Sequence, residues 1–123
     1  MPSTESCFTT LESSVLRAIC EKESVDRDRT ALEAQLSEAV LVSRENTGAG
    51  FYTSFSVNRG SNLPVGGERL RNGPEMRIDG LQHGMGFIPW LKDGYAELIE
   101  GYSYGESTIE IDFERVGFEI LKQ

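Results

Sequence analysis

Residues that bind transition metals, or that serve as bases for a nucleophile, are scarce in this sequence. Its 123 residues include one histidine, His83, and two cysteines, Cys7 and Cys20. A zinc site made of cysteine and histidine would lack ligands, and a serine–histidine–aspartate triad would depend on His83 alone. Cys20 has the spacing of a buried helical thiol, and a chain of this length does not need a disulfide. Because no complete phosphate-binding motif is present either, we expect no metal and no other cofactor.

Basic residues are also few relative to acidic ones. The chain has 12 lysine and arginine residues against 20 aspartate and glutamate residues, a net charge of −8. Nucleic acids and anionic membranes require clustered positive charge, so we expect neither as a partner, whereas a basic protein partner is permitted. No apolar run approaches the roughly 20 residues of a membrane span, and the N-terminus lacks a basic, signal-like start. The expected location is the cytoplasm.

The composition suits one packed domain. Hydrophobic residues make up 38% of the chain and charged residues 26%, which is ordinary for a globular protein. We assign residues 1–123 to a single domain and expect residues 1–8 to be frayed.

Two helices are predicted near the N-terminus, over residues 9–23 and about 29–38. Thr9 or Thr10 can cap the first helix and Asp28 the second. Apolar residues recur at helical spacing at Leu11, Val15, Leu16, Ile19 and Cys20, and at Ala31, Leu32, Leu36 and Ala39. The short connection between the two segments favours a helical hairpin or a bent pair.

After these helices the apolar period changes from that of a helix to that of a strand. Residues 51–57 alternate most regularly, with four apolar or threonine positions against tyrosine and serine. The other strands are expected at 39–45, 75–81, 86–92, 95–102 and 109–114, the last with Glu110, Asp112 and Glu114 on its wet face. The expected class is therefore α+β, with two helices followed by a mainly antiparallel sheet of five to six strands.

The segment 58–74 between the predicted strands is long and rich in glycine, asparagine and proline. Residues 58–77 carry four basic and two acidic groups, so this part is positive in an acidic chain. Arg59, Arg69, Arg71 and Arg77 are therefore candidates for binding a phosphate or carboxylate ligand. The alternative is a solvated loop without a ligand.

The Asp93-Gly94 dipeptide is the strongest hairpin signal in the chain. A two-residue turn here pairs Lys92 with Tyr95 and, continued without interruption, pairs Phe87 with Glu100. Glu100 would then lie on a largely apolar face. A carboxylate there needs a cation or hydrogen-bond donor, or its pKa rises.

Five polar residues are candidates for one pocket: Glu45, His83, Glu100, Tyr102 and Tyr104. An acid, a base and phenols in one cleft would suit hydrolysis or proton transfer. In the alternative interpretation the tyrosines pack in the fold, the nearby glycines shape turns, and Glu100 pairs with an arginine such as Arg44.

Three segments carry a resemblance: SRENTGAGFYT (43–53), GLQHGMGF (80–87) and DGYAELIEGYSYGE (93–106). With them the chain resembles, over about residues 30–107, a group of small bacterial proteins that share a helical N-terminus and have no established activity. Similar hairpins recur in small domains associated with bacterial toxin immunity. The resemblance implies a fold and no catalytic residue.

The leading functional hypothesis is therefore a non-enzymatic domain that acts through protein contacts, self-associates as a homodimer, and in a more specific form inhibits a basic partner. The alternative is a small-molecule-binding protein or hydrolase-like enzyme. Its pocket would lie between the 58–77 loop and the Glu100 hairpin.

Overall fold

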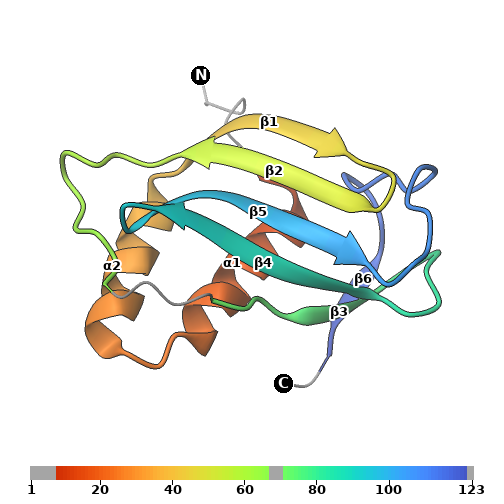
Figure 1. Ribbon diagram of the computed structural model, residues 1–123, viewed down its shortest axis with the longest axis horizontal. Helices are drawn as coiled ribbons and strands as arrows, with labels where there is room; N and C mark the ends of the chain where they lie inside the picture. Colours follow the sequence, from red (N-terminus) through yellow and green to blue (C-terminus); the bar gives the residue numbers. More distant parts are fainter. Residues whose placement is uncertain (1–7, 67–70, 122–123) are drawn as a thin grey trace.

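The computed structural model describes residues 8–66 and 71–121, and within them it contains two α-helices followed by a six-stranded antiparallel sheet (Figure 1). The helices are α1 (Thr10–Lys22) and α2 (Asp26–Ser37). The strands are β1 (Val40–Asn46), β2 (Gly50–Ser56), β3 (Glu75–Ile78), β4 (Met85–Lys92), β5 (Tyr95–Ser103) and β6 (Phe118–Ile120). The predicted α+β class is confirmed.

The sheet has the strand order β1-β2-β5-β4-β3-β6, and both helices pack against one side of it, the inner face (Figure 1). The core lies between the helices and this face, and it contains fully buried side chains such as Val15, Leu32, Phe87 and Ile99. Among the described residues, no helix or loop lies over the opposite side, the outer face, in Figure 1. Within the described part of the chain, one side of the sheet is therefore uncovered.

Helix α1 begins as the sequence predicts and α2 does not. The Oγ1 atom of Thr9 accepts the Glu12 backbone N–H at 3.1 Å, and Glu12 Oε1 accepts the Thr9 N–H at 2.8 Å, so two orphan donors of the first turn are satisfied. Helix α2 already begins at Asp26. The prediction that Asp28 caps it is wrong, because that carboxylate lies inside the first turn and accepts the backbone N–H of Gly66 at 3.0 Å.

Of residues 1–8, expected to be frayed, the structure describes only Phe8. Residues 1–7 lie outside the described part of the chain, and Cys7 lies among them. The ring of Phe8 packs edge-on against Phe55, with the centroids 5.8 Å apart. Cys20 is buried, as predicted, and burial raises the pKa of its thiol to about 11.

The β4–β5 turn forms as predicted. Asp93 and Gly94 have φ values of 56° and 85°, and positive values at both positions are what a type I′ turn requires. Lys92 pairs with Tyr95. The strands predicted at 39–45 and 51–57 form the antiparallel β1–β2 hairpin, with its turn at residues 47–49.

Strand β5 contains a bulge that the sequence did not reveal. Glu97 has no partner in β4, so the register shifts by one residue and Ile88, not Phe87, faces Glu100. A shift of one residue moves all following side chains to the other side of a sheet. The prediction that Glu100 lies among the apolar side chains was therefore wrong: it lies on the outer face.

Gly101 allows two aromatic rings to meet on the inner face. It pairs with Phe51 on one side and Phe87 on the other, and the two ring centroids are 5.9 Å apart. A Cβ atom at Gly101 would lie 2.8 Å from Phe87 Cε1 and 3.0 Å from Phe51 Cε2. This close packing explains why position 101 is a glycine.

Gln35 joins helix α2 to the β4–β5 hairpin. Its side chain is fully buried. Its Nε2 atom donates to the backbone oxygens of Leu63 at 2.9 Å and Gly94 at 3.0 Å, and its Oε1 atom accepts the N–H of Ala96 at 3.0 Å. The amide is thus satisfied by two segments that are distant in sequence, the loop at Leu63 and the β4–β5 hairpin.

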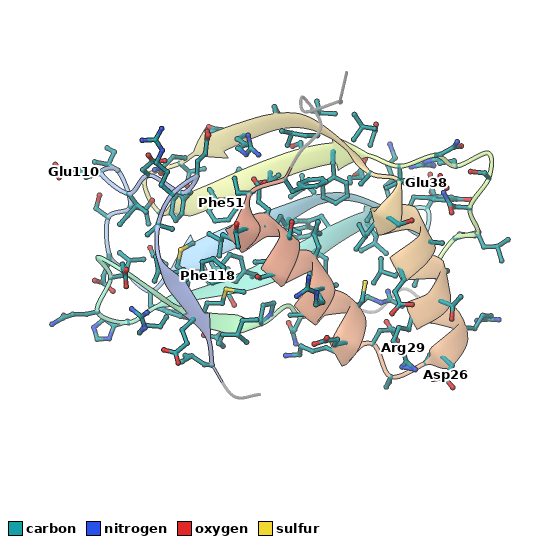
Figure 2. The ribbon with its side chains drawn as sticks, turned by 180° about the vertical axis from the view of Figure 1, so that it is seen from behind. Asp26, Arg29, Glu38, Phe51, Glu110 and Phe118 are labelled. Atoms are coloured by element: carbon teal, nitrogen blue, oxygen red, sulfur yellow. The ribbon has the colours of Figure 1, made fainter. Side chains whose placement is uncertain are left out.

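The predicted strand 109–114 is not a strand. Within the described C-terminal part, only Phe118–Ile120 joins the sheet, beside β3. The preceding segment crosses the inner face beside α1 (Figure 2). Phe113 packs on Phe51 with a centroid distance of 4.6 Å, whereas Ile109 is 73% exposed. Instead of forming a strand, this segment is a loop, and its alternating apolar residues cover the core.

Candidate functional site

The outer face can be followed row by row across the strands, since paired residues point to the same side of a sheet. In the central row Glu45 pairs with Tyr52, Tyr52 with Glu100, and Glu100 with Ile88. The adjoining rows contain Ser54, Leu98 and Trp90 on one side, and Tyr102, Gly86 and Glu75 on the other.

This surface is unusually rich in accessible aromatic side chains. Tyr52 is 36% exposed, Trp90 43% and Tyr104 44%, and the half-buried Ile88 and Leu98 lie between them. Clustered exposed apolar surface commonly marks an interaction site. Sequence reasoning missed Tyr52 and Trp90 as site residues, although the alternation of Tyr52 with the buried Phe51 already placed its side chain on the wet side of β2.

Glu100 and Trp90 form a pair on this face. The indole Nε1–H of Trp90 donates to Glu100 Oε1 at 2.9 Å, so the partner of Glu100 is a neutral donor and not the expected arginine. Arg44 instead lies on the inner side, where its Nε donates to Glu12 Oε2 at 2.7 Å. Among the described residues, no donor bonds to the Oε2 atom of Glu100.

A second aromatic–carboxylate cluster lies over Gly86. The Tyr104 hydroxyl hydrogen bonds to Glu75, with 2.7 and 2.6 Å to the two carboxylate oxygens, and its ring meets Tyr102 edge-on at 5.5 Å. A Cβ atom at Gly86 would lie 2.4 Å from the Tyr102 hydroxyl and 2.8 Å from Glu75 Oε2. Desolvation and the hydrogen bond to Glu75 raise the pKa of Tyr104, so this phenol stays protonated and donates.

Charge is distributed unevenly over the outer face. Its carboxylates come from Glu45, Glu75, Glu97 and Glu100 and, at the β3–β6 edge, from Glu119, which pairs with Arg77. Cations lie at the margins. Lys92 lies at the hairpin end, with Arg59 over the ring of the neighbouring Tyr95. Arg77 lies at the β3–β6 edge, where it bonds to Asp79 and Glu119. Within the described residues the middle rows therefore present negative charge and aromatic rings without a cation.

The five residues predicted to share a pocket are only partly brought together. Glu45, Glu100, Tyr102 and Tyr104 share the outer face. His83 lies in the turn between β3 and β4, and its backbone N–H donates to Glu106 Oε2 at 2.8 Å.

The three candidate anion-binding arginines that the structure describes occupy separate parts of the fold. Arg71 is 8% exposed and its Nε bonds to Glu23 Oε1 at 2.7 Å. Arg59 lies near Asp93 and over the ring of Tyr95, 4.6 Å from its centroid. Arg77 is held at the β3–β6 edge, and Arg69 lies outside the described residues. Arg59, Arg71 and Arg77 thus each have an acidic partner of their own.

The ionic site around Glu12 is structural in character. Glu12 is 3% exposed; its carboxylate accepts Arg44 Nε at 2.7 Å and the Thr53 hydroxyl at 2.7 Å. Burial raises the pKa of Glu12, but the hydrogen bonds from Arg44, Thr53 and the Thr9 backbone outweigh it, so the pKa is lowered. A carboxylate held ionised in this way is a poor general acid.

A hollow between the described part of the 58–74 loop and helix α2 lies beside Leu63. It has a volume of about 500 Å³ and is lined by α2 residues Asp26, Arg27, Thr30, Ala31 and Ala34 and by loop residues Ser61, Asn62 and Leu63. It therefore lies elsewhere than the predicted pocket position between the loop and the Glu100 hairpin.

The fold and surface define a small α+β protein with an open, aromatic and acidic sheet face. No family model matches the chain, and neither the curated proteins nor the solved structures contain a significant match to it. None of the described helices is long and apolar enough to cross a membrane. The described residues likewise contain no cluster of histidine, cysteine and carboxylate side chains arranged to hold a metal ion.

Proposed function

We propose that this protein is a non-catalytic binding domain whose outer face holds a basic segment of another protein, as an inhibitor or immunity protein would. One observation carries the proposal: an open sheet face combines exposed Tyr52, Trp90 and Tyr104 with four carboxylates. Aromatic rings attract arginine and lysine through their π-systems, and carboxylates bond to the same cations. The net charge of −8 would also speed the approach of a basic partner.

The charge of this face favours a different protein over a second copy of the chain. A two-fold contact places the same patch on both subunits, so Glu45, Glu75, Glu97 and Glu100 would face their own counterparts. Like charges across an interface cost several kcal/mol, on the order of a hundredfold or more in affinity. The homodimer expected from the sequence stays a prediction, and this face is the less suitable surface for it.

The hydrogen bonding of the same residues supports binding over catalysis. Glu100 is engaged by the neutral Trp90 indole, and Tyr104 is held protonated against Glu75. Proton transfer requires an acid and a base tuned toward neutral pH and aimed at one reacting atom. The outer face offers instead several fixed acceptors spread across a flat surface, which suits a macromolecular partner.

The proposal is tested with the full-length, isotope-labelled protein and a short peptide of alternating arginine and serine. Trp90 is the single tryptophan in the sequence, so its indole N–H gives one isolated resonance on the proposed surface. We expect the arginine peptide to shift this resonance and the backbone amides of β2, β4 and β5. Raising the salt concentration should weaken the effect because the contacts are ionic and accessible.

The matched control is the same peptide with glutamate in place of arginine, which should leave the spectrum unchanged. Shifts confined to α1 and α2, or equal shifts with both peptides, would contradict the proposal. Sedimentation at increasing protein concentration tests the competing occupant. A dimer whose formation is abolished by Trp90→Ala would assign the outer face to a second copy.

A further inference from the structure

Two aromatic–carboxylate pairs stand apart on the outer face. Trp90 holds Glu100 through its indole, and Tyr104 holds Glu75 through its hydroxyl. Both aromatic residues are over two-fifths exposed, whereas both carboxylates are half-buried. Each pair thus presents an aromatic surface beside an oriented acceptor, the combination that a planar guanidinium can use for stacking and hydrogen bonding together.

Strand β4 fixes the separation of the two pairs. Trp90 lies on β4, and Glu75 pairs with Gly86 on the same strand. Trp90 is four positions along the strand from Gly86, which corresponds to about 13 Å at the usual rise of about 3.3 Å per residue. Glu100 lies on β5 opposite Ile88 and accepts the Trp90 N–H diagonally, whereas Glu75 lies on β3 opposite Gly86. The two carboxylates therefore flank β4 on opposite sides, and Trp90 and Gly86 mark the direction along the strand.

On β4 itself, the residue between the two pairs is apolar. Ile88 lies midway along β4 and points to the same side as Trp90, because alternate residues of a strand share a face. Ile88 is half-buried and pairs with Glu100. Along β4 the surface changes from the exposed Trp90 ring to the apolar Ile88, with Glu100 beside it on β5, and then to the aromatic–carboxylate cluster over Gly86.

We infer that the bound segment is an extended strand with the pattern arginine–any–apolar–any–arginine, lying along β4 with one arginine at each aromatic–carboxylate pair. This inference rests on the proposed function and specifies its partner. In an extended chain the first, third and fifth residues point to one side and the outer two are about 13 Å apart. Packed sheets lie about 10 Å apart, a gap that arginine side chains from the segment can span.

The test compares two peptides of equal composition. One contains Arg-Ser-Ile-Ser-Arg and the other Arg-Arg-Ile-Ser-Ser. We expect the spaced peptide to bind the wild-type protein about tenfold more tightly, because two linked ionic contacts form only when their spacing matches the site. Titration of the Trp90 indole resonance, with calorimetry in parallel, gives both affinities.

Variants locate the two contacts. Glu100→Gln and Glu75→Gln should each weaken the spaced peptide about tenfold, the typical effect of losing one hydrogen bond to a charged group, and each should abolish its advantage over the adjacent-arginine peptide. Glu33→Gln, at an exposed position of α2 on the other side of the sheet, makes the same change in net charge. It should leave the affinity and the spacing preference intact.

The outcomes separate this inference from the proposed function. If neither arginine peptide shifts the Trp90 resonance, the proposed function fails and the inference fails with it. If both peptides shift it with equal affinity, or if Glu75→Gln has no effect on the spaced peptide, the two-arginine pattern is overturned while basic binding at the face stands. The comparison of peptides on the wild-type protein needs no variant to fold.

Discussion

Replacing Arg71 with alanine is expected to destabilise the protein by about 3–5 kcal/mol, the usual cost of removing one partner from a buried ionic network. The Arg71 side chain is 8% exposed, and it bonds to Glu23 at 2.7 Å, to Asp28 at 3.5 Å and to the Gly66 backbone oxygen at 2.8 Å. Removing the guanidinium leaves the Glu23 and Asp28 carboxylates buried without this cation. Urea denaturation, followed by circular dichroism at neutral pH, measures the change.

Arg59→Ala is the matched control for this prediction. It also removes one arginine from the segment between β2 and β3, but the Arg59 side chain is 46% exposed and lies 3.5 Å from the exposed Asp93. Such surface pairs contribute about 1 kcal/mol or less. Equal losses for the two variants would show that Arg71 acts as an ordinary surface residue and would contradict its assigned role.

Glu12→Gln is expected to destabilise the protein by about 3 kcal/mol at neutral pH, by breaking a largely buried ion pair. The substitution keeps the shape of the side chain but removes the charge that Arg44 and Thr53 bond to. It also tests whether the link between α1 and strands β1 and β2 is ionic. The free energy of unfolding from urea titrations gives the difference from wild type.

The pH dependence of that difference has a definite sign. The pKa of Glu12 is lower in the folded protein than its ordinary value, so the unfolded chain takes up the proton first as the pH falls. The advantage of wild type over Glu12→Gln should be full above the ordinary glutamate pKa of about 4.3 and shrink as the pH falls further toward the folded-state pKa. A difference that grows on acidification would contradict this assignment.

Local signals explain which parts of the fold are predictable from the sequence. Thr9 and Glu12 are three residues apart and make a capping box that needs no tertiary information. Asp93-Gly94 specifies its turn by backbone preference alone. The alternation of apolar and polar residues around Phe51 correctly predicts which side of β2 is buried, because few other placements of the strand agree with that alternation.

The features that the sequence did not reveal depend on distant partners. The bulge at Glu97 is one case: either register gives β5 an acceptable pattern, and what distinguishes them is the fit of Gly101 between Phe51 and Phe87 and the bond from Ala96 to Gln35. The outer-face site is hard to predict from the sequence for the same reason. Without the bulge, Trp90 and Glu100 are assigned to opposite sides of the sheet, and their hydrogen bond cannot be foreseen.

The contacts of Gln35 have a consequence for how the chain folds during synthesis. The helices are made first, but the partners of Gln35 are Leu63, Gly94 and Ala96, which leave the ribosome much later. Until β5 is available, this amide must stay hydrated and α2 lacks its docking surface. Long-range pairing of this kind slows folding, so the nascent helical hairpin should remain undocked and accessible to chaperones until most of the chain has been made.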